Sequence, residues 1–188
     1  MQEGMFAGAG GVPLYFRRFG EGRRALIVPN AAWLADLTGL VQGRTAVFYD
    51  PRGRGKSGPV SDKAKITLEA EIEDLDSVVR HFELDQVVLF GWSYHGAVVA
   101  NYASRHPDAV QRVIQSGPMA PRRIPYSDRA NATLQSRLDA AAIAELMKSS
   151  PSNPVEACKA WGSILLRAYF FDPAAKARSM ASPCDLEN

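Results

Sequence analysis

Residues 90–96 read FGWSYHG and join an apolar run to a helical pattern, with Ser93 at the junction. The apolar run Val87–Phe90 predicts a buried strand, and the pattern from Ser93 to Arg105 predicts a helix. A serine on such a turn is held above the end of a sheet, where its hydroxyl can attack a carbonyl carbon. We therefore interpret Ser93 as a catalytic nucleophile and the Tyr94 N–H as a donor to the oxyanion. The alternative is that Ser93 only caps the helix.

Strand-like and helix-like segments alternate along this part of the chain. The clearest helical pattern has apolar residues at i, i+4, i+7, i+11 and i+14 from Leu68 to Phe82, behind Thr67 as its N-cap. Such alternation predicts an α/β fold with a mostly parallel sheet and helices on both faces. The opening segment Val12–Phe19 is expected to add an antiparallel strand at one edge. The other expected strands are Ala25–Val28, Thr45–Tyr49, Val87–Phe90 and Val110–Gln115.

The character of the sequence changes after about Pro121, because β-rich runs give way to helical stretches separated by Pro and Ser. We expect residues 1–121 to form the sheet unit and residues 122–188 to form a separate helical segment. A second helix in that segment is expected at about Val155–Phe171. Before it, one amphipathic face is predicted through Leu134, Leu138, Ala142 and Leu146.

A second turn motif, DPRGRGKS at residues 50–57, also directly follows an apolar run. Its glycines permit a tight turn that other residues would strain. The Gly-Lys-Ser ending is typical of a phosphate-binding loop, but such a loop needs a glycine where this chain has Asp50. Gly58-Pro59 would also interrupt the helix that must follow. The nucleotide-binding interpretation is therefore disfavoured.

The two turn motifs, in this order, resemble the α/β-hydrolase superfamily over Leu14 to Pro118. The segment SGPMAP at residues 116–121, which leads into helices, is similar to the proline iminopeptidase and esterase branch. The resemblance implies a serine hydrolase that cleaves an ester or amide bond through an acyl-enzyme on Ser93. It also implies that residues 122–188 form a helical lid. A small-molecule or short-peptide substrate is expected, with no cofactor and no metal.

The resemblance further places a second oxyanion donor in the loop after Ala25–Val28, at the Ala31 N–H. Relatives often carry His-Gly where this chain has Pro29-Asn30, so the loop departs from the commoner pattern. Asn30 is expected either to contact substrate or to be a turn residue bonded to its own backbone. For Trp161, packing against the preceding helix is the alternative to a pocket role. The candidate substrate-pocket residues are Asn30, Trp33, Trp92 and Trp161.

The histidine that would complete a catalytic triad is missing from these 188 residues. In the resembling family the acid and the histidine follow the serine along the chain, yet no histidine occurs after His106. His95, at a position where relatives usually have a small residue, is disfavoured as a base because residues two apart on a helix face different directions. His81 and His106 are interpreted as structural. We therefore expect a chain truncated inside the lid, without the catalytic histidine and acid, and nearly inactive.

If the C-terminal core strands are absent, Val110–Gln115 is expected to be an uncovered edge strand. Val110 and Ile114 would then offer an apolar template for pairing with other chains. An alternative function is consistent with this expectation. The chain would be a non-catalytic binding or interaction module on an α/β-hydrolase scaffold, its lid and sheet edge pairing with another polypeptide.

Composition excludes several partner classes. The chain is 46% hydrophobic and 22% charged with a net charge of +2, and its charges are spread along the sequence. No nucleic-acid partner is therefore expected. There is no apolar run near the ~18 residues of a spanning helix and no secretory signal pattern, so no membrane partner and a cytoplasmic location are expected. Cys158 and Cys184 have no metal-ligand spacing and are expected to be reduced packing residues.

Overall fold

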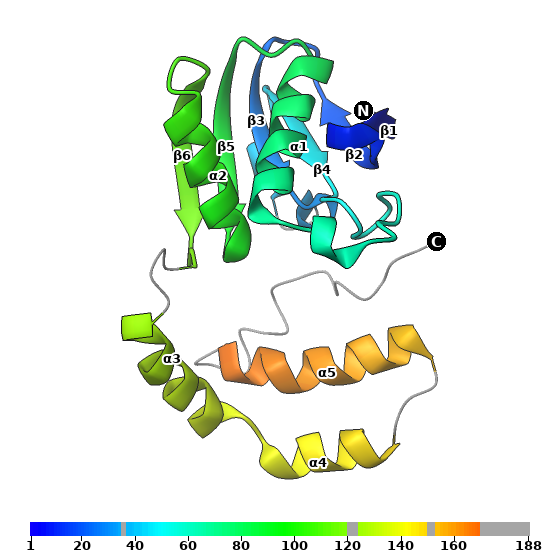
Figure 1. Cartoon of the computed structure of the whole chain (residues 1–188), viewed down its shortest axis with the longest axis vertical. Coiled ribbons are helices and arrows are strands. Elements are labelled where there is room, and N and C mark those ends of the chain that lie inside the picture. Colours follow the sequence, from blue (N-terminus) through cyan, green and yellow to red (C-terminus); the bar gives the residue numbers. More distant parts are fainter. Residues whose placement is uncertain (35–36, 120–123, 150–152, 170–188) are drawn as a thin grey trace. The chain divides into compact units, whose positions relative to one another are not determined.

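The computed structural model describes residues 1–34, 37–119, 124–149 and 153–169. The chain divides into two compact units, Met1–Pro121 and Arg122–Asn188, at the point where the sequence changes character. The described part of the first unit is built on one six-stranded sheet in the order β1-β2-β4-β3-β5-β6 (Figure 1). Its strands are β1 (Gln2–Ala7), β2 (Pro13–Phe19), β3 (Arg24–Pro29), β4 (Thr45–Tyr49), β5 (Gln86–Trp92) and β6 (Val110–Ser116).

The sheet is parallel through its second half and antiparallel at its N-terminal end. β4, β3, β5 and β6 run parallel, whereas β2 is antiparallel to both β1 and β4. The predicted α/β class and its four parallel strands are confirmed. The expectation that Val12–Phe19 would form the edge is wrong, because Gln2–Ala7 pairs with the outer side of β2. Only Phe6 is buried in β1, so this strand has no apolar alternation that a sequence pattern would reveal.

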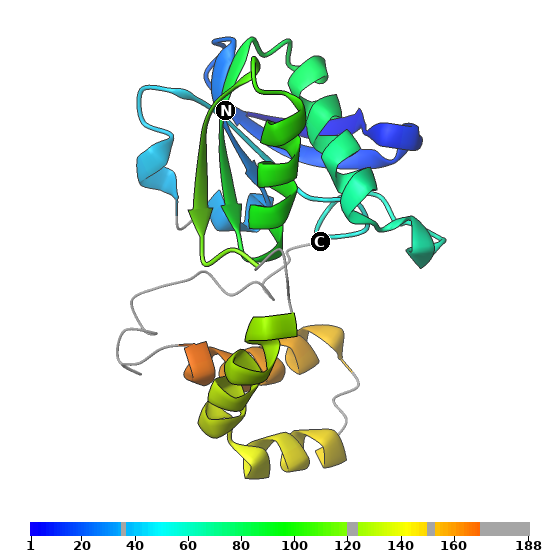
Figure 2. The ribbon, with the colours of Figure 1, turned by 60° about the vertical axis from the view of Figure 1, so that its left-hand side comes forward.

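Two helices, α1 (Leu68–His81) and α2 (Tyr94–Arg105), cover the same face of the sheet (Figures 1 and 2). The N-cap of α1 is Thr67, as predicted, and its hydroxyl accepts a hydrogen bond from the Ala70 N–H at 3.1 Å. A buried cluster between these helices and the sheet includes Leu14, Ile27, Val47, Leu75, Val78, Leu89, Val98 and Tyr102. This core fixes the start of α2, and therefore the position of the turn that carries Ser93.

The opposite face of the sheet is covered in a different way from the prediction. Among the described residues of this unit, both α-helices lie on the first face, so the expectation of helices on both faces is wrong. Short 3₁₀ turns at Ala31–Leu34 (η2) and Thr38–Leu40 (η3) pack against the second face instead. Two further 3₁₀ turns lie at Ala9–Gly11 (η1) and Lys63–Lys65 (η4). The described apolar residues that pack on this face without a full helix are Ala31, Leu34, Leu37, Leu40 and Val41.

β6 is the last strand of the described sheet, with β5 as its neighbour. Val113 and Ile114 are exposed, with 37% and 44% of their surface accessible. The prediction of an uncovered edge strand is confirmed for the described residues. Val110 differs from the expectation, because it is half-buried and packs against the main core cluster.

In the described part of the second unit, three helices are present: α3 (Ile124–Arg137), α4 (Ala140–Ser149) and α5 (Pro154–Tyr169). The predicted continuous face from Leu134 to Leu146 is broken, because the side chain of Asp139 accepts the Ala142 N–H at 3.0 Å and starts a new helix. Cys158 on α5 is disulfide-bonded, which contradicts the expected reduced state, and Cys184 lies outside the described residues. Among the described helices, none has the length and apolar character needed to cross a membrane.

Candidate active site

The segments that follow β3, β4 and β5 leave the sheet on the side where the carboxyl ends of these strands lie. β3, β4 and β5 are parallel, so the segments that follow them begin at the same ends of the strands. The Asn30 N–H donates to the Tyr49 carbonyl at 2.7 Å and joins the ends of β3 and β4. The Ser93 N–H donates to the Ser116 carbonyl at 3.1 Å and joins the turn after β5 to the end of β6.

Ser93 occupies the sharp turn between β5 and α2 in a conformation that few residues other than glycine adopt. Its φ is 52° and its ψ is −121°, outside the main regions allowed to L-residues. Although Ser93 directly precedes α2, its side chain forms no capping hydrogen bond. This observation does not support the alternative that Ser93 is only a helix cap. Backbone strain at a serine between a strand and a helix is the local geometry that the nucleophile prediction requires, and the role itself stays a prediction.

Close backbone packing holds this elbow in place. The Ser93 carbonyl accepts hydrogen bonds from the Gly96 and Met119 N–H groups, each at 3.0 Å. A Cβ added at Gly91 would lie 2.5 Å from the His95 carbonyl oxygen, and one added at Gly96 would lie 2.7 Å from Pro118 Cβ. The glycines on either side of Ser93 are therefore required by steric contact with the elbow and with the segment after β6.

Replacing Gly91 with alanine should test how tightly the elbow is packed. We expect Gly91→Ala to lower the free energy of unfolding by about 2 kcal/mol, because the new methyl group meets backbone atoms that cannot swing aside. Urea denaturation followed by far-UV circular dichroism measures the change. Gly39→Ala is a matched control, since a Cβ there would have no heavy atom within 4 Å. Equal losses in the two variants would contradict the close packing described above.

The two predicted oxyanion donors differ in their surroundings. Tyr94 is the first residue of α2, so its N–H has no acceptor within the helix and stays a candidate donor. The Ala31 N–H, in contrast, donates to Asp50 Oδ1 at 2.9 Å, and both residues are buried. An oxyanion would have to displace the Asp50 carboxylate to receive this N–H. The role of Ala31 as an oxyanion donor therefore stays a prediction, and the sequence pattern does not show that Asp50 takes this N–H.

The predicted pocket residues belong to both units. Asn30 directly follows β3 with a φ of 139°, in the region of backbone conformations that favours glycine. Trp92 is the last residue of β5 and is 38% exposed. Trp161 lies on α5 in the second unit, also 38% exposed, and the side chain of Trp33 is outside the described part. A shared substrate pocket for these four residues stays a prediction.

His95 is directed toward helix α1. Its Nε2 lies 3.7 Å from Glu71 Oε2, and the His95 side chain is only 15% exposed. Burial lowers the pKa of His95 to about 4, and the positive charge of Arg54 acts in the same direction. No hydrogen bond between His95 and the Ser93 hydroxyl is present in the described structure. His95 therefore does not have the contact that a base for Ser93 would need.

The other two histidines pack against aromatic rings. The His81 ring stacks on Phe6, with 4.7 Å between ring centroids, and the His106 ring stacks on Tyr102 at 4.3 Å. The His81 ring packs the end of α1 against β1, whereas His106 packs against a residue of the helix that it caps. These contacts agree with the structural interpretation of the two residues.

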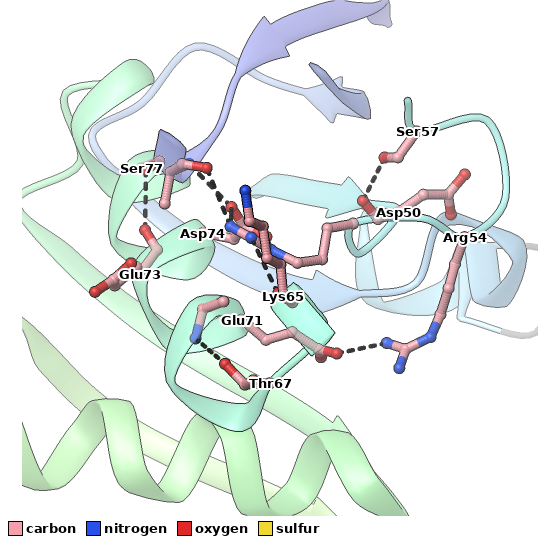
Figure 3. A network of polar contacts seen from close by, with 12 residues as sticks. Asp50, Arg54, Ser57, Lys65, Thr67, Glu71, Glu73, Asp74 and Ser77 are labelled. Atoms are coloured by element: carbon pink, nitrogen blue, oxygen red, sulfur yellow. Dashed lines mark hydrogen bonds and ion pairs between the residues drawn. The ribbon is translucent and has the colours of Figure 1, made fainter. Parts of the chain in front are cut away.

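The glycine-rich turn after β4 is held by its own side chains. Ser57 Oγ donates to the Asp50 carbonyl at 2.6 Å and accepts the Tyr15 N–H at 2.9 Å (Figure 3 shows the first of these contacts). Asp50 Oδ2 accepts the Lys56 N–H at 2.9 Å, and a Cβ at Gly55 would lie 2.2 Å from the same oxygen. The residues that would cradle a phosphate are thus used to close the turn. This arrangement agrees with the rejection of a nucleotide-binding loop.

Sequence reasoning did not identify the buried acids of α1. Glu71 is 1% exposed and Asp74 is fully buried, although both look like residues of a charged helix surface. Their spacing with Val78 at i, i+3 and i+7 places them on the apolar face of the helix and is the one signal that points to burial. Each is paired with an arginine of the glycine-rich turn, Asp74 with Arg52 and Glu71 with Arg54.

Comparisons with known proteins agree with this geometry. Residues 27–165 match the family described as alpha/beta hydrolase fold. Serine hydrolase BPHL from Mus musculus is 30% identical over 113 residues, which are 55% of this chain and 39% of that protein. A proline iminopeptidase from Saccharolobus solfataricus is 32% identical over 95 residues, which are 50% of this chain and 29% of the relative. The chain thus spans less than two fifths of the length of these relatives.

Solved structures share the fold at lower sequence identity. An alpha/beta hydrolase from Novosphingobium aromaticivorans superposes with a TM-score of 0.56 at 20% identity, covering 61% of this chain and 43% of that one. A mutant epoxide hydrolase from Vigna radiata gives 0.60 at 19% identity, covering 80% and 52%. These likenesses concern the fold alone.

Proposed function

Because the chain belongs to the α/β hydrolase fold family, we propose that Ser93 is the nucleophile of a serine hydrolase. The observation that carries this proposal is the strained backbone of Ser93 on the β5–α2 turn, together with the absence of a capping bond to its side chain. Strain of this kind persists where the surrounding structure enforces it and is concentrated at functional sites. The relatives named serine hydrolase and proline iminopeptidase support a carboxylic ester or amide as the substrate class.

The reaction would proceed in two steps. Ser93 Oγ attacks the carbonyl carbon, its proton passes to a base, and the bond to the alcohol or amine breaks as that leaving group takes the proton. The Tyr94 N–H donates to the oxyanion while the intermediate exists. Water then hydrolyses the acyl-enzyme, which releases the carboxylic acid and restores the Ser93 hydroxyl. The substrate would be a small molecule or a short peptide.

The base and its acid are proposed to come from sequence of the parent protein outside these 188 residues. Among the described residues, none of the three histidines has a hydrogen bond to the Ser93 hydroxyl, and His95 faces Glu71 instead. Without a base the serine hydroxyl keeps its high pKa and is a weak nucleophile. We therefore propose that the 188-residue chain by itself is nearly inactive.

A fluorophosphonate probe tests the nucleophile directly. Ser93 Oγ displaces fluoride from the phosphorus of the probe, and peptide mass spectrometry identifies the labelled residue. In the protein expressed through its whole coding sequence, we expect labelling at Ser93 and none in Ser93→Ala. The 188-residue chain is expected to react at least about 1,000-fold more slowly, because loss of a triad member removes that much or more.

Ser104→Ala provides the control, since Ser104 is an exposed serine on the same helix. It should label like the wild type. Stable labelling of another residue, or no labelling of the whole protein, would contradict the proposal. Absence of labelling together with saturable binding of a ligand would favour a non-catalytic binding module instead.

A further inference from the structure

Two buried polar atoms face each other behind the nucleophile turn. His95 Nε2 and Glu71 Oε2 are 3.7 Å apart, and neither has a hydrogen-bond partner among the described residues. The two side chains are 15% and 2% exposed. Buried polar atoms are nearly always hydrogen-bonded, so an orphaned donor and acceptor at this separation need an explanation. The separation is about 0.5 Å beyond a direct hydrogen bond and too short for a bridging water.

The other oxygen of Glu71 is already engaged. Arg54 Nη1, from the glycine-rich turn after β4, donates to Glu71 Oε1 at 2.8 Å (Figure 3). The guanidinium also lies over the Tyr94 ring, with its central carbon 5.7 Å from the ring centroid. One carboxylate on α1 therefore stands between the turn after β4 and the turn that bears Ser93.

The protonation states of His95 and Glu71 are compatible with a hydrogen bond between their side chains. Burial holds the pKa of His95 well below neutral, so its ring is uncharged at pH 7 and one ring nitrogen carries a proton. Burial raises the pKa of Glu71, while Arg54 opposes that rise. An N–H on His95 Nε2 would satisfy the orphaned oxygen of Glu71 after a small side-chain rotation. The same rotation would give His95 Nε2 a hydrogen-bond acceptor.

His95 is also part of the elbow itself. Its backbone carbonyl is the atom that a Cβ at Gly91 would meet, and its neighbour Gly96 donates to the Ser93 carbonyl. A side chain anchored to α1 at this position restricts the backbone that carries the nucleophile. The bulky residue that departs from the pattern of the resembling family thereby has a structural partner.

We propose that Glu71 and His95 are positioning residues, which anchor the Ser93 turn to α1 and to the Arg54 turn through a hydrogen bond from His95 Nε2 to Glu71. In this arrangement His95 takes no proton from Ser93. The effect on Ser93 reactivity rests on the proposed function, whereas the hydrogen bond itself does not.

The first arm of the test is independent of activity. Nitrogen-15 NMR of the 188-residue chain at pH 7 reports which ring nitrogen of each histidine is protonated, and the His95→Gln variant identifies the His95 signals by their loss. We expect the Nε2–H tautomer, and a changed Nε2 shift in Glu71→Gln but not in Glu73→Gln. Glu73 is exposed and lies two residues away on the same helix. An Nδ1–H tautomer, or identical spectra in Glu71→Gln, would overturn the proposal.

The second arm measures the rate of fluorophosphonate labelling at Ser93 in the whole protein. His95→Leu and Glu71→Gln should each slow labelling by about 10- to 100-fold, as expected for a misplaced nucleophile. Glutamine at position 95 carries an amide donor near the place of Nε2, so His95→Gln should recover most of the rate. Equal loss in His95→Gln and His95→Leu would assign His95 as a base, and an unchanged rate in His95→Leu would remove any positioning role.

The two arms separate the two proposals. If Ser93 in the wild type is not labelled, the proposed function fails. The NMR measurement of the His95 tautomer, and of the change in its Nε2 shift in Glu71→Gln, still tests the hydrogen bond. If Glu71→Gln does not fold, the second arm uses the comparison of labelling rates between His95→Leu and His95→Gln.

Discussion

Replacing Arg52 with methionine is expected to lower the free energy of unfolding by about 3–5 kcal/mol, because it leaves the Asp74 carboxylate charged and buried. The Arg52 and Asp74 side chains are 6% and 1% exposed. Arg52 Nε and Nη2 donate to the two oxygens of Asp74 at 2.7 and 2.8 Å. Asp74 also accepts the Ala9 N–H at 3.0 Å, and Arg52 donates to the Ala9 carbonyl at 3.1 Å. The pair therefore anchors the turn between β1 and β2 as well as α1.

Urea denaturation of the wild type and Arg52→Met measures this loss. Arg23→Met is the matched control, because the Arg23–Asp85 pair is 60% and 57% exposed and should contribute less than about 1 kcal/mol. The double variant Arg52→Met/Asp74→Leu should recover most of the stability, since it removes the unpaired charge. If Arg52→Met and Arg23→Met are equally mild, the buried pair does not have the role assigned to it.

A second large effect concerns pH. The pKa of His95 is 6.5 when unperturbed and about 4 in the fold, so we expect His95 to make the protein about 3 kcal/mol less stable at pH 4 than at pH 7.5. Above pH 6.5 the ring is neutral in both states. As pH falls below 6.5 the unfolded chain binds the proton first, so stability falls until about pH 4 and the loss then stops.

Glu71 acts in the opposite direction. Burial raises its pKa, so the folded state binds a proton before the unfolded chain does, and stability is gained as pH falls. The positive charge of Arg54 also acts on His95 and disfavours protonation of its ring. Because Glu71 offsets part of the effect, the contribution of His95 is best measured as a difference between variants.

Denaturation of the wild type and His95→Gln at several pH values between 4 and 7.5 makes this comparison. The wild type should lose about 3 kcal/mol more than His95→Gln over that range. Ser93→Ala keeps His95 while altering the same turn, so it should follow the wild type. Parallel pH profiles for the wild type and His95→Gln would show that His95 is not held in a buried, neutral state.

The sequence predicted the parts of the fold that depend on local patterns. The helix behind Thr67 has a helical apolar spacing, and the parallel strands are apolar runs too short and too rich in β-formers for a helix. β1 was missed because only Phe6 is buried there, and pairing with β2 rather than burial makes it a strand. The break before α4 was missed because the capping bond of Asp139 competes with an apolar spacing that continues across it.

In the candidate site, too, local features could be predicted from the sequence, whereas contacts between distant segments could not. Ser93 could be predicted as a nucleophile because a serine between a strand and a helix is a local feature, and that role stays a prediction. The engagement of Ala31 with Asp50, and the burial of Glu71 against His95, are contacts between segments distant in the chain. The spacing of Glu71 with Asp74 and Val78 indicates the buried face of α1, but it does not show which partners these acids contact.

The double engagement of Asp50 has a consequence for redesign. One carboxylate accepts N–H groups from Ala31 and from Lys56, so the loop after β3 and the turn after β4 share a single anchor. Libraries that vary residues 30–34 alone will therefore be selected first for backbone paths that keep the Ala31 N–H bonded to Asp50. Asp50 should be kept while the loop after β3 and the turn after β4 are varied together. A changed backbone path in one of them can then be accommodated by a change in the other.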